Sequence, residues 1–300
     1  MNDFDGTALD GMNLDSAMLD GTVLVTGARG NIGSRVASAL TRAGHAVRAS
    51  GRSIDGLAVP EGAEAVTLDL TEPSGAAAAL DGVRTVFLYP TFGDIGGFLA
   101  AAVEAGVEHA VLLSSPAAYD PVEHAGPIGA AHQAIEGAVR ASGLPHTVLY
   151  PSWLGSNVFR DWAGQVRAGR VPIAFPEWQI NPIHLGDVAE VAVDLLTRPQ
   201  FRGRSLVLTG PESLTQRQAV AAVAAELGRP VEVEELTREQ ALAGRPEWFP
   251  EAMFDSLLDV AANFGDTPAT VNNNVERVLG RPARTFAQWL HDERGRFDAS

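Results

Sequence analysis

The stretch that decides the fold is TVLVTGARGNIG, residues 22–33. It opens with an apolar run, Thr22–Gly27, that predicts a strand, and a helical stretch, Ile32–Ala43, follows directly. Glycines at such a strand–turn–helix junction permit a tight turn and let backbone amides approach a diphosphate at the helix N-terminus. The GxxGxxG spacing therefore predicts a dinucleotide site rather than a plain turn. The residues expected to contact the cofactor here are Gly27, Arg29, Gly30, Asn31, Ile32 and Gly33.

Outward from this stretch, strand candidates alternate with alanine-rich helical stretches such as Gly97–Gly106 and Ala130–Ser142. The strand candidates are Ala46–Ser50, Ala65–Leu70, Thr85–Tyr89, Ala110–Ser115, His146–Pro151 and Ser205–Gly210. This alternation is typical of a parallel sheet covered on both faces. The predicted fold class is α/β, a Rossmann-type doubly wound parallel sheet with a smaller, discontinuous C-terminal substrate domain.

The chain divides into three predicted parts. Residues 1–20 carry five aspartates and no base, so we expect a disordered acidic arm, with Met12 or Met18 as possible true starts. Residues 21–152 with about 180–210 form the predicted nucleotide domain. Residues 153–179, rich in tryptophan, and 211–300, rich in helical stretches, form the predicted substrate or cap domain.

Charge at the end of the second predicted strand favours NADPH over NADH. An NAD site offers an acid there for the ribose 2′-hydroxyl, but VRASGRS, residues 47–53, has no carboxylate before Asp55. Arg52 is expected to pair with a 2′-phosphate, and Arg29 to reach the same phosphate or pack on the adenine; the alternative is two solvated arginines. Asp69 and Leu70, at the end of the third predicted strand, are expected near the adenine. Asp69 either accepts a hydrogen bond from the adenine amine or caps a turn. Pro90 and Thr91, with Pro151 and Ser152, are expected at the nicotinamide.

Composition excludes several chemistries. The 300 residues hold 37 acids against 22 bases, all arginine, so the net charge is −15 and there is no lysine. Schiff-base catalysis and a Tyr–Lys pair are therefore impossible. The seven histidines show no ligand spacing, and cysteine is absent, so no metal is expected. The acidic charge argues against a nucleic-acid partner, and no apolar run is long enough for a membrane span. We expect a cytoplasmic protein, of undetermined oligomeric state.

The motifs resemble the NmrA-like branch of the atypical short-chain dehydrogenase/reductase superfamily. TGARGNIG is similar to its opening, VRASGR to its second-strand arginine segment, and IEGAVRASGLPHTVLYPSWLGSN to its helix–strand–proline segment. INPIHLGDVAEVAVDLL, LVLTGPESLT and GRPARTFAQWL resemble its later blocks. The resemblance covers nearly everything from Gly21 to Phe297. It implies a Rossmann domain, NADP(H) binding, and either reduction of a substrate or redox sensing without chemistry.

The resemblance also shows that this chain lacks the catalytic tyrosine and lysine of the family's extended members. The serine position of the family's extended members falls on Ser115, its tyrosine position on Ile128 and its lysine position on His132. The usual Tyr–Lys proton relay is therefore absent. We expect Ser114 and Ser115 to supply hydrogen-bond donors to a substrate oxygen, although one of them could instead satisfy backbone groups. Tyr119 could replace the missing phenol or be packing. His132 could hold the nicotinamide ribose or titrate, or lie on the surface.

Aromatic residues after the sixth predicted strand suggest the kind of substrate. Trp153, Phe159, Trp162, Phe175 and Trp178 are expected to line a pocket for a flat aromatic molecule; the alternative is ordinary cap-domain core. His184 opens a segment similar to the family's HxxD block, with Asp187 expected to cap the following helix. We therefore predict an NADPH-dependent ketoreductase acting on a bulky aromatic carbonyl compound, such as a polyketide or quinone-like antibiotic precursor. A redox sensor without catalysis and a quinone or azo reductase are the alternatives.

Overall fold

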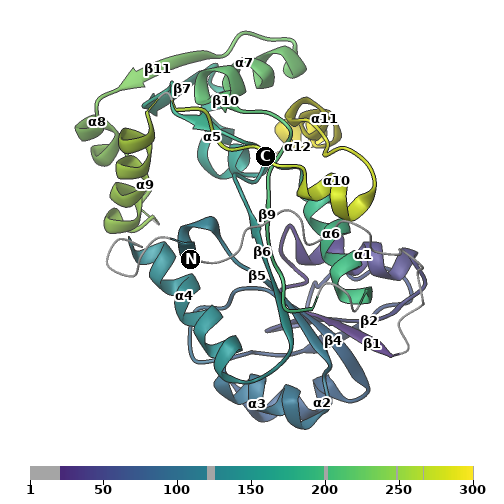
Figure 1. Cartoon of the computed structure of the whole chain (residues 1–300). Helices are drawn as coiled ribbons and strands as arrows, with labels where there is room; N and C mark the ends of the chain where they lie inside the picture. Colours follow the sequence, from purple (N-terminus) through teal and green to yellow (C-terminus); the bar gives the residue numbers. More distant parts are fainter. Residues whose placement is uncertain (1–20, 120–125, 199–201, 248, 266, 300) are drawn as a thin grey trace.

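The computed structural model describes residues 21–119, 126–198, 202–247, 249–265 and 267–299. The predicted acidic arm at residues 1–20 lies outside this range. Seven parallel strands form the main sheet, in the order β3-β2-β1-β4-β5-β6-β9. They are β1 Thr22–Val25, β2 Ala46–Gly51, β3 Glu64–Thr67, β4 Val83–Leu88, β5 His109–Leu113, β6 His146–Pro151 and β9 Ser205–Leu208. The predicted doubly wound sheet is confirmed (Figure 1).

Helices cover both faces of this sheet, and two smaller sheets lie beyond it (Figure 1). The helical elements up to β6 are α1 Gly33–Arg42, η2 Pro73–Gly75, α2 Ala76–Leu80, α3 Gly96–Glu104, η3 Pro116–Tyr119 and α4 Gly126–Ala141. The later helices are α5 Asn157–Arg167, α6 Leu185–Thr197, α7 Gln216–Leu227, α8 Arg238–Ala243, α9 Glu251–Phe264, α10 Asn274–Leu279, α11 Phe286–Asp292 and α12 Arg294–Ala299. The small sheets pair β7 Arg170–Ala174 with β11 Glu232–Leu236, and β8 Gln179–Ile180 with β10 Leu214–Thr215.

The alternation of side chains along each strand separates two hydrophobic cores. On β1, Val23 and Val25 face the α1 and α6 side, whereas Leu24 faces the α2, α3 and α4 side. Strands covered on both faces need apolar residues at successive positions, which is why TVLV predicted the strand correctly. The core on the α1 and α6 side continues without a break into α5, α7, α10 and α11. The domain boundaries drawn from the sequence stay a prediction.

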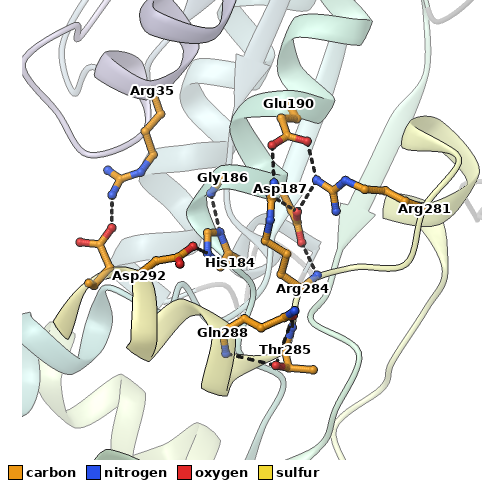
Figure 2. A network of polar contacts seen from close by, with 11 residues as sticks. Arg35, His184, Gly186, Asp187, Glu190, Arg281, Arg284, Thr285, Gln288 and Asp292 are labelled. Carbon is orange, nitrogen blue, oxygen red and sulfur yellow. Dashed lines mark hydrogen bonds and ion pairs between the residues drawn. The ribbon is translucent and has the colours of Figure 1, made fainter. Parts of the chain in front are cut away.

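A buried carboxylate joins the C-terminal segment to α6 (Figure 2). Asp187, which is 0% exposed, accepts from the Arg281 Nη2 at 2.8 Å, the Arg284 Nη1 at 2.6 Å and the Arg284 backbone amide at 2.7 Å. Glu190, one turn further along α6, pairs with the same two guanidinium groups. The helix cap is instead His184, whose Nδ1 accepts from the Gly186 amide at 2.9 Å. The prediction that Asp187 caps the helix was wrong, because its carboxylate faces the 281–284 segment.

Two further ion pairs connect the C-terminal helices to the start of α6 and to α1 (Figure 2). The Nε2 of His184 lies 3.2 Å from an Asp292 carboxylate oxygen, and Arg35 of α1 pairs with Glu293. Next to these pairs, the Trp289 side chain is 0% exposed. Its ring stacks on that of Phe286, with the ring centroids 5.7 Å apart. The C-terminal helices are therefore held against α1 and α6 by ion pairs, with aromatic packing beside them.

Replacing Asp187 with asparagine should lower the free energy of unfolding by about 3 kcal/mol, because two guanidinium groups lose their buried counter-charge. Chemical denaturation of the two proteins measures the difference. Asp161→Asn removes an exposed partner of Arg160 and serves as the control, with an expected change below about 0.5 kcal/mol. Equal changes in the free energy of unfolding for the two substitutions would contradict the role given to Asp187.

Candidate active site

The glycine turn brings the start of α1 against the end of β1. Gly27 has φ 63°, a left-handed conformation that favours glycine. A Cβ at Gly33 would lie 2.4 Å from the Gly27 carbonyl oxygen, so a side chain at position 33 would push the helix away. The turn therefore requires glycine at both positions, as the sequence predicted. It fixes the N-terminus of α1 at the carboxyl edge of the sheet, where ligands of open α/β sheets bind.

The N-terminus of α1 is suited to an anion. Among the residues that the structure describes, no side chain caps this helix, and its first turn carries no acid. Its open amides and dipole therefore suit a diphosphate. The Asn31 carbonyl accepts from Arg35 Nη1 at 2.8 Å, and Ile32 is 3% exposed and lies in the core. A contact of Ile32 with a cofactor would therefore come from its backbone, whereas the Asn31 side chain is exposed.

The two arginines assigned to the 2′-phosphate occupy different positions. The guanidinium of Arg29 donates to the carbonyl oxygens of Ser53, Asp55 and Gly56, at 3.1, 2.8 and 3.1 Å, and so holds the loop after β2. Arg52 follows β2 directly and is exposed. The sequence did not predict that Arg29 would shape this loop. Because the Arg29 guanidinium already binds three carbonyl groups, the exposed Arg52 fits a phosphate better.

Asp69 follows β3 and organises a turn. Its Oδ1 accepts from the Thr71 hydroxyl at 2.7 Å and from the Thr71 amide at 2.9 Å. These two hydrogen bonds, with a smaller contribution from Arg52, hold the pKa of the Asp69 carboxyl below its usual value. The turn-capping alternative is therefore confirmed, and a contact of Asp69 or the buried Leu70 with the adenine stays a prediction.

The segment after β4 crosses the glycine turn. The hydroxyl of Thr26 donates to the Phe87 carbonyl at 3.0 Å and accepts from the Tyr89 amide at 2.8 Å, which ties the ends of β1 and β4 together. The Tyr89 side chain lies against Gly27, where a Cβ would be 2.7 Å from the Tyr89 Cβ. Pro90 and Thr91 follow, half-buried. Tyr89 was not assigned a role from sequence, since a tyrosine that ends a strand has no local signal of function.

A polar cluster lies below the carboxyl end of β5, on the α4 side of the sheet. Ser114, 5% exposed, donates from Oγ to the Glu136 Oε1 at 2.5 Å and lies 3.4 Å from the His132 Nδ1. Tyr150 of β6 donates to the other oxygen, Glu136 Oε2, at 3.0 Å. The structure therefore brings Ser114 and His132, two of the predicted site residues, together. It adds Glu136 and Tyr150, which sequence reasoning missed because a helix glutamate and a strand tyrosine each resemble ordinary packing.

Two further residues border this cluster. Tyr119 of η3 packs its ring on Tyr150, with centroids 4.3 Å apart. Burial raises the pKa of both phenols, so both stay protonated at neutral pH. Burial also lowers the pKa of His132, which is therefore neutral at pH 7. The Phe92 ring meets His132 edge-on, with centroids 5.8 Å apart.

Ser115 lies differently from its neighbour. It is half-buried, and its Oγ accepts from the Ala117 amide at 3.3 Å, which leaves its own hydroxyl hydrogen available. Ile128, at the matched tyrosine position, lies half-buried in the first turn of α4. His132, at the matched lysine position, is 9% exposed, which excludes the surface position considered from sequence. Pro151 ends β6, buried, and Ser152 donates to the Asn181 carbonyl at 2.9 Å.

The residues of the predicted aromatic pocket pack largely in or against the hydrophobic core on the α1 and α6 side of the sheet. Trp162 is 4% exposed, and Trp153 packs on it with centroids 5.8 Å apart. Phe159 packs on Trp289 and Phe297, and Trp178 packs half-buried against the same core. Substrate contact by Trp153, Phe159 and Trp178 stays a prediction, whereas Trp162 has almost no surface left for it.

Two absences hold for the part of the chain that the structure describes. No group of three histidine, aspartate or glutamate side chains there is arranged to hold a metal ion. Within the same residues, no helix has the length and apolar character that crossing a membrane requires.

Comparison with known proteins agrees with this geometry. A family model described as NAD(P)H-binding matches residues 27–199. The (4-alkanoyl-5-oxo-2,5-dihydrofuran-3-yl)methyl phosphate reductase of Streptomyces griseus is 36% identical over 273 residues, which is 89% of this chain and 96% of the relative. The NAD(P)H azoreductase of Xenophilus azovorans is 32% identical over 292 residues, 93% of this chain and 100% of the relative.

Among solved structures, an NADPH-dependent quinone oxidoreductase from Escherichia coli has the same fold. Its TM-score is 0.75 at 22% identity, and the match covers 92% of this chain and 99% of that one. The family match spans more than half of the chain, and both sequence relatives are named reductases. The chain therefore belongs to this NAD(P)H-binding family, as its NmrA-like motifs indicate, and is an NAD(P)H-dependent oxidoreductase.

Proposed function

We propose that the chain uses NADPH to reduce a carbonyl group on a bulky aromatic small molecule without a Tyr–Lys dyad. The observation that carries the proposal is the Ser114–His132–Glu136 cluster. Ser114 lies just past the carboxyl end of β5, whereas His132 and Glu136 lie on α4, the helix that bears both matched dyad positions. The Streptomyces griseus relative is named a reductase of a small molecule that carries carbonyl groups, which supports a small-molecule substrate.

The residues that would hold the cofactor follow from the edge of the sheet. The amides at the start of α1 suit the diphosphate, and Arg52 suits the 2′-phosphate that distinguishes NADPH from NADH. Pro90 and Thr91 follow β4, Pro151 ends β6, and all three would border the nicotinamide. When bound, NADPH supplies the hydride, so the protein has to orient the carbonyl group, exclude water and provide a proton.

Exposed aromatic side chains near the turn favour a flat substrate. Tyr89 is 38% exposed over the glycine turn, and Phe92 is 61% exposed beside His132. Rings left in solvent at a ligand-binding edge offer a stacking surface. They take the role that the sequence assigned to the cap tryptophans. The half-buried Ser115 would donate to the substrate oxygen, since its hydroxyl hydrogen is available.

Quinone or azo reduction is the second candidate. Its support is the absent dyad together with the Xenophilus azovorans relative, which is named an azoreductase. The reduced forms of quinones and azo compounds can take protons from water, so these reactions need no acid on the protein. The two candidates therefore differ in whether the polar cluster around Glu136 matters for turnover.

The first test is NADPH consumption with three substrate classes: ortho-hydroxyaryl ketones, quinones and azo dyes. We expect oxidation of NADPH with the ketones and formation of the matching alcohols, measured by absorbance and by mass spectrometry. A protein that binds NADPH and reduces only the quinones or azo dyes would support the second candidate instead.

Arg52→Ala should weaken NADPH binding about 10- to 100-fold, because one charge-assisted contact with the 2′-phosphate is lost. NADH, which has no such phosphate, should bind as before. Fluorescence titration of both cofactors measures the change. Arg204→Ala, an exposed arginine just before the amino end of β9, is the matched control. An equal loss for both cofactors would mean that Arg52 holds the loop rather than the phosphate.

Ser115→Ala should slow ketone turnover by no more than about 10-fold when the ketone carries its own neighbouring phenol, since that phenol stabilises the developing oxyanion. The same variant should lose more with a ketone that lacks the phenol. Steady-state kcat for the two ketones measures the contrast. A loss of several orders of magnitude with both ketones, with NADPH binding intact, would refute substrate-assisted stabilisation.

A further inference from the structure

One face of α9 carries apolar side chains that none of the hydrophobic cores among the described residues includes. Phe254 and Leu258 of this helix pack in a small core with residues of β7, β11 and α8. Met253, Leu257 and Val260, which we call the α9 wall, are half-buried and belong to none of the three cores. Their spacing places them along one stripe of the helix. Apolar surface gains free energy when it leaves water, so such a stripe marks a candidate contact surface.

The contacts on either side of the α9 wall show which way it faces. On one side lies the face with Leu258, which packs in the small core with α8. On the other side lies Ser256, which meets the first residue of α4, because a Cβ at Gly126 would lie 2.6 Å from the Ser256 Oγ. At about 3.6 residues per turn, the α9 wall falls between these two faces. It is therefore turned toward the start of α4, beside which α9 stands (Figure 1).

This part of α4 belongs to the candidate active site. Ile128, at the matched tyrosine position, follows Gly126 by two residues, is half-buried and belongs to none of the three cores. His132, one turn further along α4, lies beside Ser114 and meets the ring of Phe92 edge-on. The α9 wall, Ile128 and Phe92 therefore border the carboxyl edge of the sheet, where ligands of this type of fold bind.

Positive charge is scarce around these apolar residues. The sequence has no arginine between Arg84 and Arg140, a span that includes β4, β5 and most of α4, and α9 carries three acids and no base. Arg238 and Arg245, in α8 and just after it, are paired with the acids of α9. A phosphate or carboxylate group against the α9 wall would lose water without gaining a counter-charge, which is costly. An uncharged apolar group has no such cost there.

We propose that the α9 wall and Ile128 bind an uncharged apolar group of the substrate, next to the reacting carbonyl, and so select it over an anionic one. The inference rests on the proposed carbonyl reduction and names the part of the substrate that is recognised, an alkyl or aryl group. The wall residues touch this group and not the reacting atoms, so they determine specificity rather than rate. The position that lacks the family's tyrosine thus becomes part of the substrate-binding surface.

A series of ortho-hydroxyaryl ketones whose alkyl group grows from methyl to butyl tests the contact. Binding of each ketone to the protein saturated with NADP+ is measured by isothermal titration calorimetry. Wild-type Kd should fall about 3- to 4-fold for each added methylene, the gain for a CH2 group that leaves water. In Leu257→Ala this gain should drop below about 2-fold, because less apolar surface meets the chain. The melting temperature and the Kd of NADPH should stay as in the wild type.

Two further variants separate substrate binding from structure. Val103→Ala shortens an exposed apolar side chain on α3 and is the matched control, with binding of the ketone series unchanged. Leu257→Arg places a cation on the α9 wall. It should weaken binding of the butyl ketone and permit binding of the same ketone with a phosphate ester at the end of its alkyl chain. The wild-type protein should not bind this phosphate ester, and tight binding of it by the wild type would overturn the proposed selection.

The remaining outcomes keep this inference apart from the proposed function. Wild-type binding that does not change with alkyl length, or Leu257→Ala that keeps the full gain, overturns the role of the α9 wall alone. Graded binding by a wild-type protein that reduces none of the ketones supports the α9 wall and overturns the carbonyl reduction. A wild-type dimer in analytical ultracentrifugation that becomes a monomer in Leu257→Arg would show that a second copy covers the α9 wall, and would overturn the inference.

Discussion

The approach of α1 to the end of β1 is the constraint on which the site depends. Because Gly33 has no side chain, the first helical residue sits against the Gly27 carbonyl, and the helix N-terminus lies at the edge of the sheet. Thr26 then joins the ends of β1 and β4 through two hydrogen bonds. The position of the α1 N-terminus, the place of Tyr89 and the direction of the segment after β4 all follow from these contacts.

Much of the fold was predictable, because it depends on local pattern. The apolar runs at β1, β4, β5 and β6 are buried on both faces, so they needed no partner to be recognised. The glycine turn carries its own signal in its spacing. Ser114 and Ser115 were found because the end of a strand in a parallel sheet is where ligands bind.

The remaining features depend on contacts between distant segments. Glu136 and Tyr150 meet 14 residues apart on different elements, and each alone resembles common packing. Asp187 was assigned to a helix cap from its neighbours in sequence, whereas its true partners are 94 and 97 residues away. The aromatic residues after β6 were assigned to a pocket by composition, yet Trp162 packs inside the core. Composition shows that aromatic residues are concentrated in one segment, but it does not show whether their side chains face a pocket or the core.

The conformation of the loop after β2 depends on a residue that lies outside the loop. Arg29, inside the glycine turn, holds the carbonyl groups of residues 53, 55 and 56. The loop that the sequence assigns to the ribose is thus held in its conformation by a residue of the glycine turn. An engineer who wished to exchange the cofactor preference by transplanting this loop would have to transplant the arginine as well, because the two segments form one module although 24 residues separate them.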